Sequence, residues 1–202
     1  MNNNDNKDTA IVVFNGRQQK FGINTTEFNN TLLRIGYKTN TFISDTTKTW
    51  YNGEGVFDPL LLKVQRFVDS HSDKRIVFMG SSMGGFGAIL FASFIPQCTK
   101  VVAFSPQIAI DPKLTVPWDE RYLDSVGKLR HFPFPTVENK FRRDIPYNIL
   151  YGSEEPKDRK HLDIIGNKLY SNVTIDKCVG AGHNVPAYLK STNTLDTTLW
   201  IF

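Results

Sequence analysis

The sequence lacks the features that mark nucleic-acid-binding and membrane-spanning proteins. Its 202 residues carry a formal net charge of +4, but the basic residues are scattered and no run of five or more Lys or Arg occurs. Without a basic stripe, nucleic acid is not an expected partner. No apolar stretch approaches the roughly 20 residues that a membrane-spanning helix requires, so no membrane span is expected either.

Cysteine is equally scarce. Cys98 and Cys178 are the only two, and nothing in the sequence pairs them, so a protein kept reduced in the cytoplasm is the simpler prediction. The polar residues 1–8 have neither the basic start nor the apolar stretch of a signal peptide. The cysteines and the four histidines show no metal-ligand spacing, so we expect neither a metal nor a cofactor.

What the chain does have is the composition of one globular domain. Hydrophobic residues make up 40% of it and aromatic residues 12%, enough for a sizeable core at this length. We expect a flexible tail over residues 1–9 and a single domain over 10–202. Residues 106–145 hold five prolines and five aromatic side chains, too many aromatics for a linker, so we predict a cap-like insertion there.

Short apolar strands alternate with amphipathic helices along the rest of the chain. The predicted strands are 10–14, 41–43, 75–79, 100–104, 147–151 and 173–179, and the main predicted helices are 26–35, 59–70, 157–170 and 186–190, with one more after residue 82. This alternation predicts an α/β protein with a mostly parallel sheet of about six strands and helices on both faces. Ligands of such sheets bind beyond the carboxyl ends of the strands, so the loops there should form the site.

The joint between the third strand and its helix carries the sequence GSSMG at residues 80–84, a G-x-S-x-G pattern. A strand that turns directly into a helix strains the corner residue, and glycines two positions before and after avoid a collision. Ser82 at the corner would face the unpaired amides of the helix start. That setting suits a nucleophile whose attack creates an oxyanion; the alternative is a Gly/Ser turn that only caps the helix.

A serine nucleophile needs a base, and the base needs a carboxylate. His183 follows the last strand after a glycine, and its near-neutral titration suits the base; the alternative is a loop histidine with no such role. The loop after strand 147–151 offers Glu154, Glu155 and Asp158. We favour Asp158 as the acid, the alternative being that all three are solvated acids at a helix N-terminus.

With this order of nucleophile, acid and histidine, the chain resembles a small member of the α/β-hydrolase superfamily over about residues 10–190. The pieces that carry the resemblance are the G-x-S-x-G joint, the acid after a strand, and Gly182-His183. The chain differs from many α/β-hydrolases in having no counterpart of two strands that usually precede the first one, and no His-Gly-Gly-Gly motif.

A looser resemblance is to uncharacterised hydrolase-like proteins of bacterial polysaccharide and capsule loci. The segments that carry it are Ser44-Asp45 followed by Trp50-Tyr51, the sequence FSPQ at 104–107, and GHNV at 182–185. This resemblance implies a biological setting rather than a reaction.

The superfamily resemblance implies where an oxyanion hole would lie. One donor would be the amide of Met83, directly after the nucleophile, and the second would come from the loop after the first strand, at Gly16 or Arg17. Arg17 has a second possible role in holding a substrate carboxylate or phosphate. A structural pair between Arg17 and Asp45 is the alternative.

Aromatic residues offer a candidate substrate wall. Trp50, Tyr51, Trp118 and Tyr122 would suit a sugar or an acyl chain, and packing in the core or cap is the alternative for each. Asp119 and Arg121 are expected to form an ion pair on the surface or in the cap.

Together these observations predict a serine esterase or deacylase that acts through an acyl-enzyme on a small-molecule or glycan ester. An acyltransferase with the same triad is one alternative. A non-catalytic α/β-hydrolase-fold binding partner in polysaccharide biosynthesis is the other. The apolar residues 199–202 would dock on their own sheet or on a second subunit, so a homodimer is possible.

Overall fold

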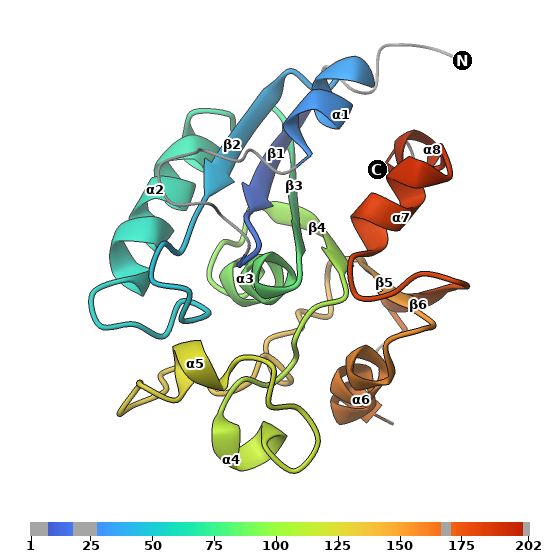
Figure 1. Cartoon of the computed structure of the whole chain (residues 1–202). Helices are drawn as coiled ribbons and strands as arrows, with labels where there is room; N and C mark the ends of the chain where they lie inside the picture. The colour runs from blue at the N-terminus through green and yellow to red at the C-terminus, as the bar shows by residue number, and fades with distance from the viewer. Residues whose placement is uncertain (1–7, 18–27, 167–170, 200–202) are drawn as a thin grey trace.

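A computed structural model describes residues 8–17, 28–166 and 171–199. In these residues six strands form one sheet in the order β2-β1-β3-β4-β5-β6, and every neighbouring pair is parallel (Figure 1). The strands are β1 (Thr9–Phe14), β2 (Thr39–Ile43), β3 (Arg75–Ser81), β4 (Cys98–Phe104), β5 (Tyr147–Gly152) and β6 (Val173–Cys178). The predicted parallel six-stranded sheet is confirmed.

Helices cover both faces of this sheet. They are α1 (Asn29–Arg34), α2 (Phe57–Asp69), α3 (Met83–Ala92), α4 (Pro112–Thr115), α5 (Leu123–Val126), α6 (Pro156–Ile165), α7 (Val185–Ser191) and α8 (Leu195–Leu199). Helices α2, α3 and α6 contribute to one hydrophobic cluster, and α1, α7 and α8 contribute to the other (Figure 1). The two clusters make the three-layer arrangement that a buried parallel sheet needs.

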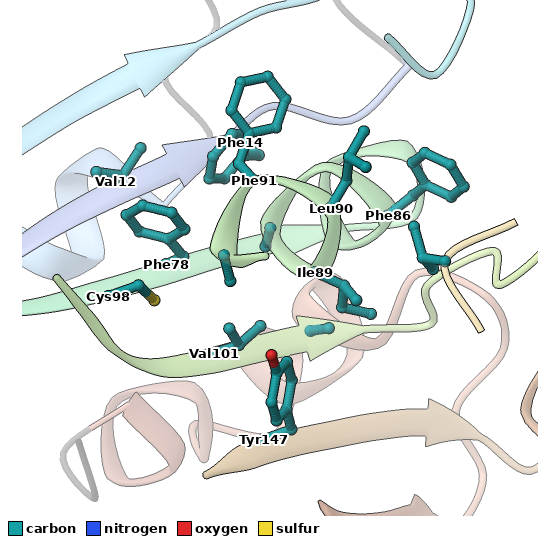
Figure 2. Close-up of a cluster of buried hydrophobic side chains, with 14 of the residues drawn as sticks. Val12, Phe14, Phe78, Phe86, Ile89, Leu90, Phe91, Cys98, Val101 and Tyr147 are labelled. Carbon is teal, nitrogen blue, oxygen red and sulfur yellow. The ribbon is translucent and has the colours of Figure 1, made fainter. Parts of the chain in front are cut away.

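Strand β1 contributes side chains to the hydrophobic clusters on both faces of the sheet. Its side chains alternate in direction, so that Val12 and Phe14 join the α3 cluster while Ile11 and Val13 join the α1 cluster. Figure 2 shows the first cluster, in which the ring centroid of Phe14 lies 5.0 Å from that of Phe91 on α3. A strand with two buried faces reads as a continuous apolar run, which is what the sequence has here.

Several element ends differ from the predicted ones. Strand β1 begins at Thr9, which is buried, so the predicted tail over 1–9 is too long; its residues 1–7 lie outside the described part. Strand β2 begins two residues earlier than predicted, at Thr39. The predicted helix 157–170 corresponds to α6, and residues 167–170 lie outside the described part.

The segment 106–145 contains only the short helices α4 and α5 as regular elements among the described residues. Figure 1 shows both helices beyond the sheet, at the end toward which β1 and β2 point. Asn52 fastens the segment by two hydrogen bonds, donating to the Phe134 carbonyl oxygen at 3.1 Å and accepting from the Phe134 amide at 2.6 Å. The segment therefore lies at the carboxyl edge of the sheet, where the candidate site residues were expected.

Two further observations concern the described residues alone. No helix there is both long and apolar enough to cross a membrane. No cluster of three or more histidine, cysteine or acidic side chains there could hold a metal ion. Leu199, the first residue of the apolar C-terminal segment, packs into the α1 cluster of its own sheet, and residues 200–202 lie outside the described part.

Candidate active site at the carboxyl edge of the sheet

Ser82 stands at the corner between β3 and α3 in a strained backbone conformation, with φ 55° and ψ −119°. Positive φ is unfavourable for any residue with a Cβ and persists only where the surroundings enforce it. Here the Ser82 amide donates to the Phe104 carbonyl oxygen at 2.8 Å, and its carbonyl oxygen accepts from the Phe86 amide at 3.1 Å. The end of β4 and the first turn of α3 thus hold the corner from both sides.

The glycines around the corner are required by close backbone packing. A Cβ on Gly80 would lie 2.4 Å from the Gly84 backbone, and one on Gly84 would lie 1.9 Å from the Phe14 carbonyl oxygen. Neither gap admits a methyl group. The start of α3 is therefore pressed against the end of β1, which brings the loop after β1 next to Ser82.

Three side chains from distant parts of the chain meet at this corner. Nε2 of His183 lies 2.9 Å from Oγ of Ser82, and Nδ1 of His183 lies 2.8 Å from both carboxylate oxygens of Asp158. Asp158 comes from the first turn of α6, and His183 comes from the loop between β6 and α7. The Asp158 side chain is 1% exposed and that of His183 is 28% exposed. The structure therefore brings together the residues predicted as nucleophile, base and acid.

The other two candidate acids point elsewhere. Glu154 accepts a hydrogen bond from the Ser153 hydroxyl at 2.8 Å. Glu155 caps α6, accepting from the Lys157 amide at 3.2 Å. Of the three acids, Asp158 is the one that contacts His183.

The positions of the protons in this cluster follow from which groups can donate a hydrogen bond and which can only accept one. A carboxylate only accepts, so Nδ1 of His183 carries a proton directed at Asp158. The lone pair of Nε2 then faces the Ser82 hydroxyl. An imidazole held in this tautomer can take a proton from the serine as its oxygen attacks an electrophile.

Asp158 also belongs to a buried cluster of charged side chains. Arg121 donates to both oxygens of Asp119 and also to Oδ1 of Asp158, so one guanidinium bridges two carboxylates that are each 1% exposed. The expected Asp119–Arg121 pair is present in the insertion rather than on the surface, and it also contacts Asp158. His161 completes the cluster: its Nδ1 accepts from the Ile108 amide at 3.2 Å, so its Nε2 donates to Asp119.

The titration of this cluster is set by burial and by these hydrogen bonds. Burial tends to raise the pKa of Asp119, but hydrogen bonds from His161 and Arg121 outweigh it and hold that pKa well below the usual range. Burial lowers the pKa of His161 despite the neighbouring Asp119. At neutral pH the cluster therefore holds an ionised Asp119, a charged Arg121 and a neutral His161.

Sequence reasoning missed Gln107 as a site residue. Its Oε1 accepts from the Trp50 indole N–H at 3.0 Å and lies 3.1 Å from Oγ of Ser82, as a second acceptor beside Nε2 of His183 for the one hydroxyl proton. Its Nε2 donates to the Tyr122 hydroxyl at 3.2 Å, and that hydroxyl lies 3.4 Å from Nε2 of His183. The signal that could have found Gln107 is its place directly after β4, at the edge where the other site residues gather.

Two of the predicted aromatic wall residues lie in the core instead. Trp50 and Tyr51 are both 0% exposed, so the prediction that they contact a substrate is wrong. Tyr51 packs on α3, where a Cβ on Gly87 would lie 2.5 Å from its ring. A loop after a strand looks exposed in sequence, but here the insertion covers it.

Trp118 lies apart from Ser82. Its indole N–H donates to the Leu114 carbonyl oxygen at 3.1 Å, and its ring meets His161 edge-on at 4.7 Å between centroids. With Leu114 and Ile164 it lines a surface hollow of about 450 Å³ between α4 and α6. No contact recorded for Trp118 reaches Ser82, so its substrate role stays a prediction.

Arg17 fastens the insertion to the loop after β1. It forms an ion pair with Asp124, donates to the Ser125 hydroxyl at 3.0 Å, and lies over the Tyr122 ring at 5.7 Å from the centroid. The alternative pair with Asp45 is wrong, because the Asp45 carboxylate accepts instead from amides and hydroxyls of its own loop. Those donors are Thr47, Thr49 and Tyr51.

The predicted oxyanion donors stand on segments that flank the serine. The amide of Met83 is the first of α3. Gly16 and Arg17 follow β1, whose last residue contacts Gly84 as described above. The end of β1 thus lies next to the Ser82 corner, and the role of these amides stays a prediction.

No protein-family model and no curated protein matches the sequence. Solved structures do match, over nearly the whole chain. MenH from S. aureus has a TM-score of 0.60 at 14% identity, with 95% of this chain and 91% of that chain covered. A propionate-bound thermophilic esterase, Est2, from the Planctomycetes species Thermogutta terrifontis has a TM-score of 0.62 at 17% identity, with 96% and 82% covered.

A third structure, the substrate-bound fluorophosphonate-binding serine hydrolase FphF from Staphylococcus aureus, has a TM-score of 0.61 at 17% identity, with 96% of this chain and 84% of that chain covered. At identities this low the likeness concerns the fold. The chain has the α/β-hydrolase fold, as its resemblance to that superfamily implied. The link to polysaccharide and capsule loci stays a prediction.

Proposed function

We propose that this chain is a serine hydrolase of carboxylic esters, in which Ser82 is the nucleophile, His183 the base and Asp158 the acid that orients the base. The observation that carries the proposal is the continuous path from Oγ of Ser82 through both ring nitrogens of His183 to Asp158, with contacts of 2.9 and 2.8 Å. A free serine hydroxyl is a weak nucleophile, and a base in this position makes attack possible.

The reaction proceeds in two halves. The Ser82 oxygen bonds to the ester carbonyl carbon, the carbonyl electron pair moves onto its oxygen, and the hydroxyl proton passes to Nε2 of His183. When the carbonyl re-forms, the bond to the alcohol breaks and the alcohol oxygen takes that proton. Water then attacks the acyl carbon, gives a proton to Nε2, and Ser82 leaves with that proton.

The negative charge that develops on the carbonyl oxygen needs donors already in place. The amide of Met83 and an amide of Gly16 or Arg17 are the donors in this proposal. The start of α3 adds its dipole on the same side. A donor of this kind contributes about 3 kcal/mol of transition-state stabilisation.

The choice of ester as substrate class rests on the structural neighbours. Two of them are named as a propionate-bound esterase and a fluorophosphonate-binding serine hydrolase, which supports an ester as the substrate and a serine as the nucleophile. Nothing in the sequence suggests an extended peptide cleft. A glycan ester is favoured among esters by the looser resemblance to polysaccharide-locus proteins.

Labelling with a fluorophosphonate probe tests the proposal. We expect the wild type to be labelled, and Ser82→Ala not to be labelled. Ser93→Ala serves as the matched control, because Ser93 directly follows α3 and its hydroxyl donates to the Leu90 carbonyl oxygen. Labelling that survives in Ser82→Ala would exclude this nucleophile. A folded wild type that never takes up the probe would favour the non-catalytic binding role.

A screen of p-nitrophenyl esters of increasing chain length, followed by acetylated sugars, then identifies the acyl group.

A further inference from the structure

The hydroxyl of Tyr122, a residue of the insertion, lies beside the nitrogen that must pass a proton to the leaving group. It lies 3.4 Å from Nε2 of His183, and Gln107 hydrogen-bonds both this hydroxyl and that of Ser82. We propose that Tyr122 is a further catalytic residue, whose hydroxyl donates a hydrogen bond to the leaving-group oxygen as the ester bond breaks. This inference rests on the proposed serine-hydrolase function.

The donor role follows from the orientation of the Gln107 amide. The Trp50 indole N–H can only donate, so the atom of Gln107 that faces it at 3.0 Å is the carbonyl oxygen Oε1. The other end, Nε2, therefore donates to the Tyr122 oxygen at 3.2 Å. Because the Tyr122 oxygen accepts from Gln107, its own proton remains available for a third group.

The position of His183 limits where that proton goes. Nε2 has one lone pair, and the Ser82 hydroxyl is the nearer donor, at 2.9 Å against 3.4 Å for Tyr122. While Ser82 donates to Nε2, the Tyr122 proton is not taken up there and stays available to a ligand oxygen. Gln107 ties the two hydroxyls together, because its Nε2 donates to Tyr122 and its Oε1 lies 3.1 Å from Oγ of Ser82.

The ring of Tyr122 is held in this place from several sides. The Trp50 ring lies 4.8 Å away between centroids. The guanidinium carbons of Arg17 and Arg121 lie 5.7 and 5.3 Å from the Tyr122 centroid. Burial also raises the pKa of the phenol, so the hydroxyl keeps its proton at neutral pH and remains a donor.

The chemical step shows when this donor matters. After attack, Nε2 of His183 carries the former Ser82 proton and must deliver it to the alcohol oxygen as the C–O bond breaks. An oxygen within reach of Nε2 is also within reach of the Tyr122 hydroxyl. The electron pair of the broken bond stays on that oxygen, and a hydrogen bond from Tyr122 stabilises the charge until the proton arrives. Tyr122 keeps its own proton throughout.

Two esters of one acid separate this role from a structural one. A nitrophenolate is a weak base and leaves without needing a proton. A methoxide is a strong base, so its departure depends on a donor that stabilises the charge on its oxygen. We expect Tyr122→Phe to lower kcat/KM for methyl propionate by about 10- to 100-fold, the effect of losing a hydrogen bond to a charged group. For p-nitrophenyl propionate the loss should stay below about threefold. Tyr151→Phe is the control, because it removes the same hydroxyl from a tyrosine that bonds Arg159 instead.

The outcomes distinguish the two proposals. Equal losses for both esters, or no loss for either, would overturn the leaving-group role of Tyr122. A wild type that takes up fluorophosphonate but hydrolyses neither ester would overturn it as well. A wild type that is never labelled would overturn the serine-hydrolase proposal, and this inference with it. The labelling rate of Tyr122→Phe, which depends on Ser82 and a fluoride leaving group, reports whether the variant has kept an intact site.

Discussion

Arg121 donates from Nη1 and Nη2 to Oδ1 of Asp158, at 3.2 Å in each case, while the same carboxylate lies 2.8 Å from Nδ1 of His183. The arginine comes from the insertion and the aspartate from α6. Within the described part of the chain, Asp119 and Glu155 also form ion pairs with Arg121, and Lys157 lies 4.0 Å from Asp119. A cation from the insertion thus shares the carboxylate with the imidazole, which makes the insertion part of the electrostatics of the site.

The first prediction concerns the pH profile of Arg121→Gln. Removing the guanidinium leaves Asp158 free to stabilise a protonated His183, and the base works only when neutral. The acidic limb of the kcat/KM profile should therefore move to higher pH. Ester hydrolysis measured from pH 5 to 9 gives the profile.

Arg121→Lys is the matched variant for this prediction. It keeps the charge but cannot bridge two carboxylates as a guanidinium does. Its acidic limb should lie near that of the wild type even where kcat is lower. If Lys and Gln shift the limb equally, the charge of Arg121 does not act on His183.

The second prediction concerns the corner that presents Ser82. In Gly84→Ala the new methyl group meets the Phe14 carbonyl oxygen at 1.9 Å, so β1 or α3 has to shift. We expect a loss of about 1–3 kcal/mol in the free energy of unfolding, or failure to fold. Gly182→Ala is the control, because nothing lies within 4 Å of its added Cβ. Thermal unfolding of the two variants compares them, and equal stability would show that the corner is not tightly packed.

Sequence predicted this corner well for a physical reason. The apolar run of β3 and the glycines at 80 and 84 act locally, because strand burial and the strain of a strand-to-helix turn depend on neighbouring residues. The meeting of Ser82, Asp158 and His183 followed from one topological rule, that parallel strands end at the same edge. Local pattern and that rule together accounted for the sheet and for the placement of the three residues.

What the sequence did not predict depends on the insertion. Gln107 gains its place, and Tyr122, one of the predicted wall residues, gains its contact with His183, only because the 106–145 segment folds back over the sheet edge. No periodicity in the sequence predicts that path. Trp50 and Tyr51 were misplaced for the same reason, since the loop that carries them is covered by α3 and the insertion. Arg121 looked like half of a local ion pair, and its second partner is 37 residues away.

The third prediction concerns the buried histidine of the ion cluster. Burial lowers the pKa of His161 in the folded state, whereas the unfolded chain titrates near the usual value of about 6.5. Below that pH the unfolded state binds a proton that the folded state does not, so the free energy of unfolding falls as pH drops from 7 towards 5. The slope approaches about 1.4 kcal/mol per pH unit for one proton.

A variant without the imidazole should lose this dependence. His161→Gln is expected to be less stable at pH 7 by about 1–3 kcal/mol, because the Ile108 amide loses its acceptor, but flatter between pH 7 and 5. His131→Gln, at an exposed position, should keep the wild-type slope. Urea unfolding at both pH values measures all three proteins. A His161→Gln slope as steep as that of the wild type would place the titrating group elsewhere.

The last prediction decides which carboxylate serves His183. In Asp158→Asn the amide keeps the shape of the side chain, but its NH2 group can donate to Nδ1 and so favour the tautomer whose proton sits on Nε2, facing Ser82. A histidine in that tautomer cannot accept the serine proton, and a loss of about 10³- to 10⁴-fold in kcat is expected. Glu154→Gln is the control of equal chemistry, since the Glu154 carboxylate bonds the Ser153 hydroxyl, and it should change kcat by less than about threefold. Initial rates on p-nitrophenyl propionate at pH 8 compare the two variants. Small and equal effects would mean that Asp158 is held by Arg121 for the fold and contributes nothing to turnover.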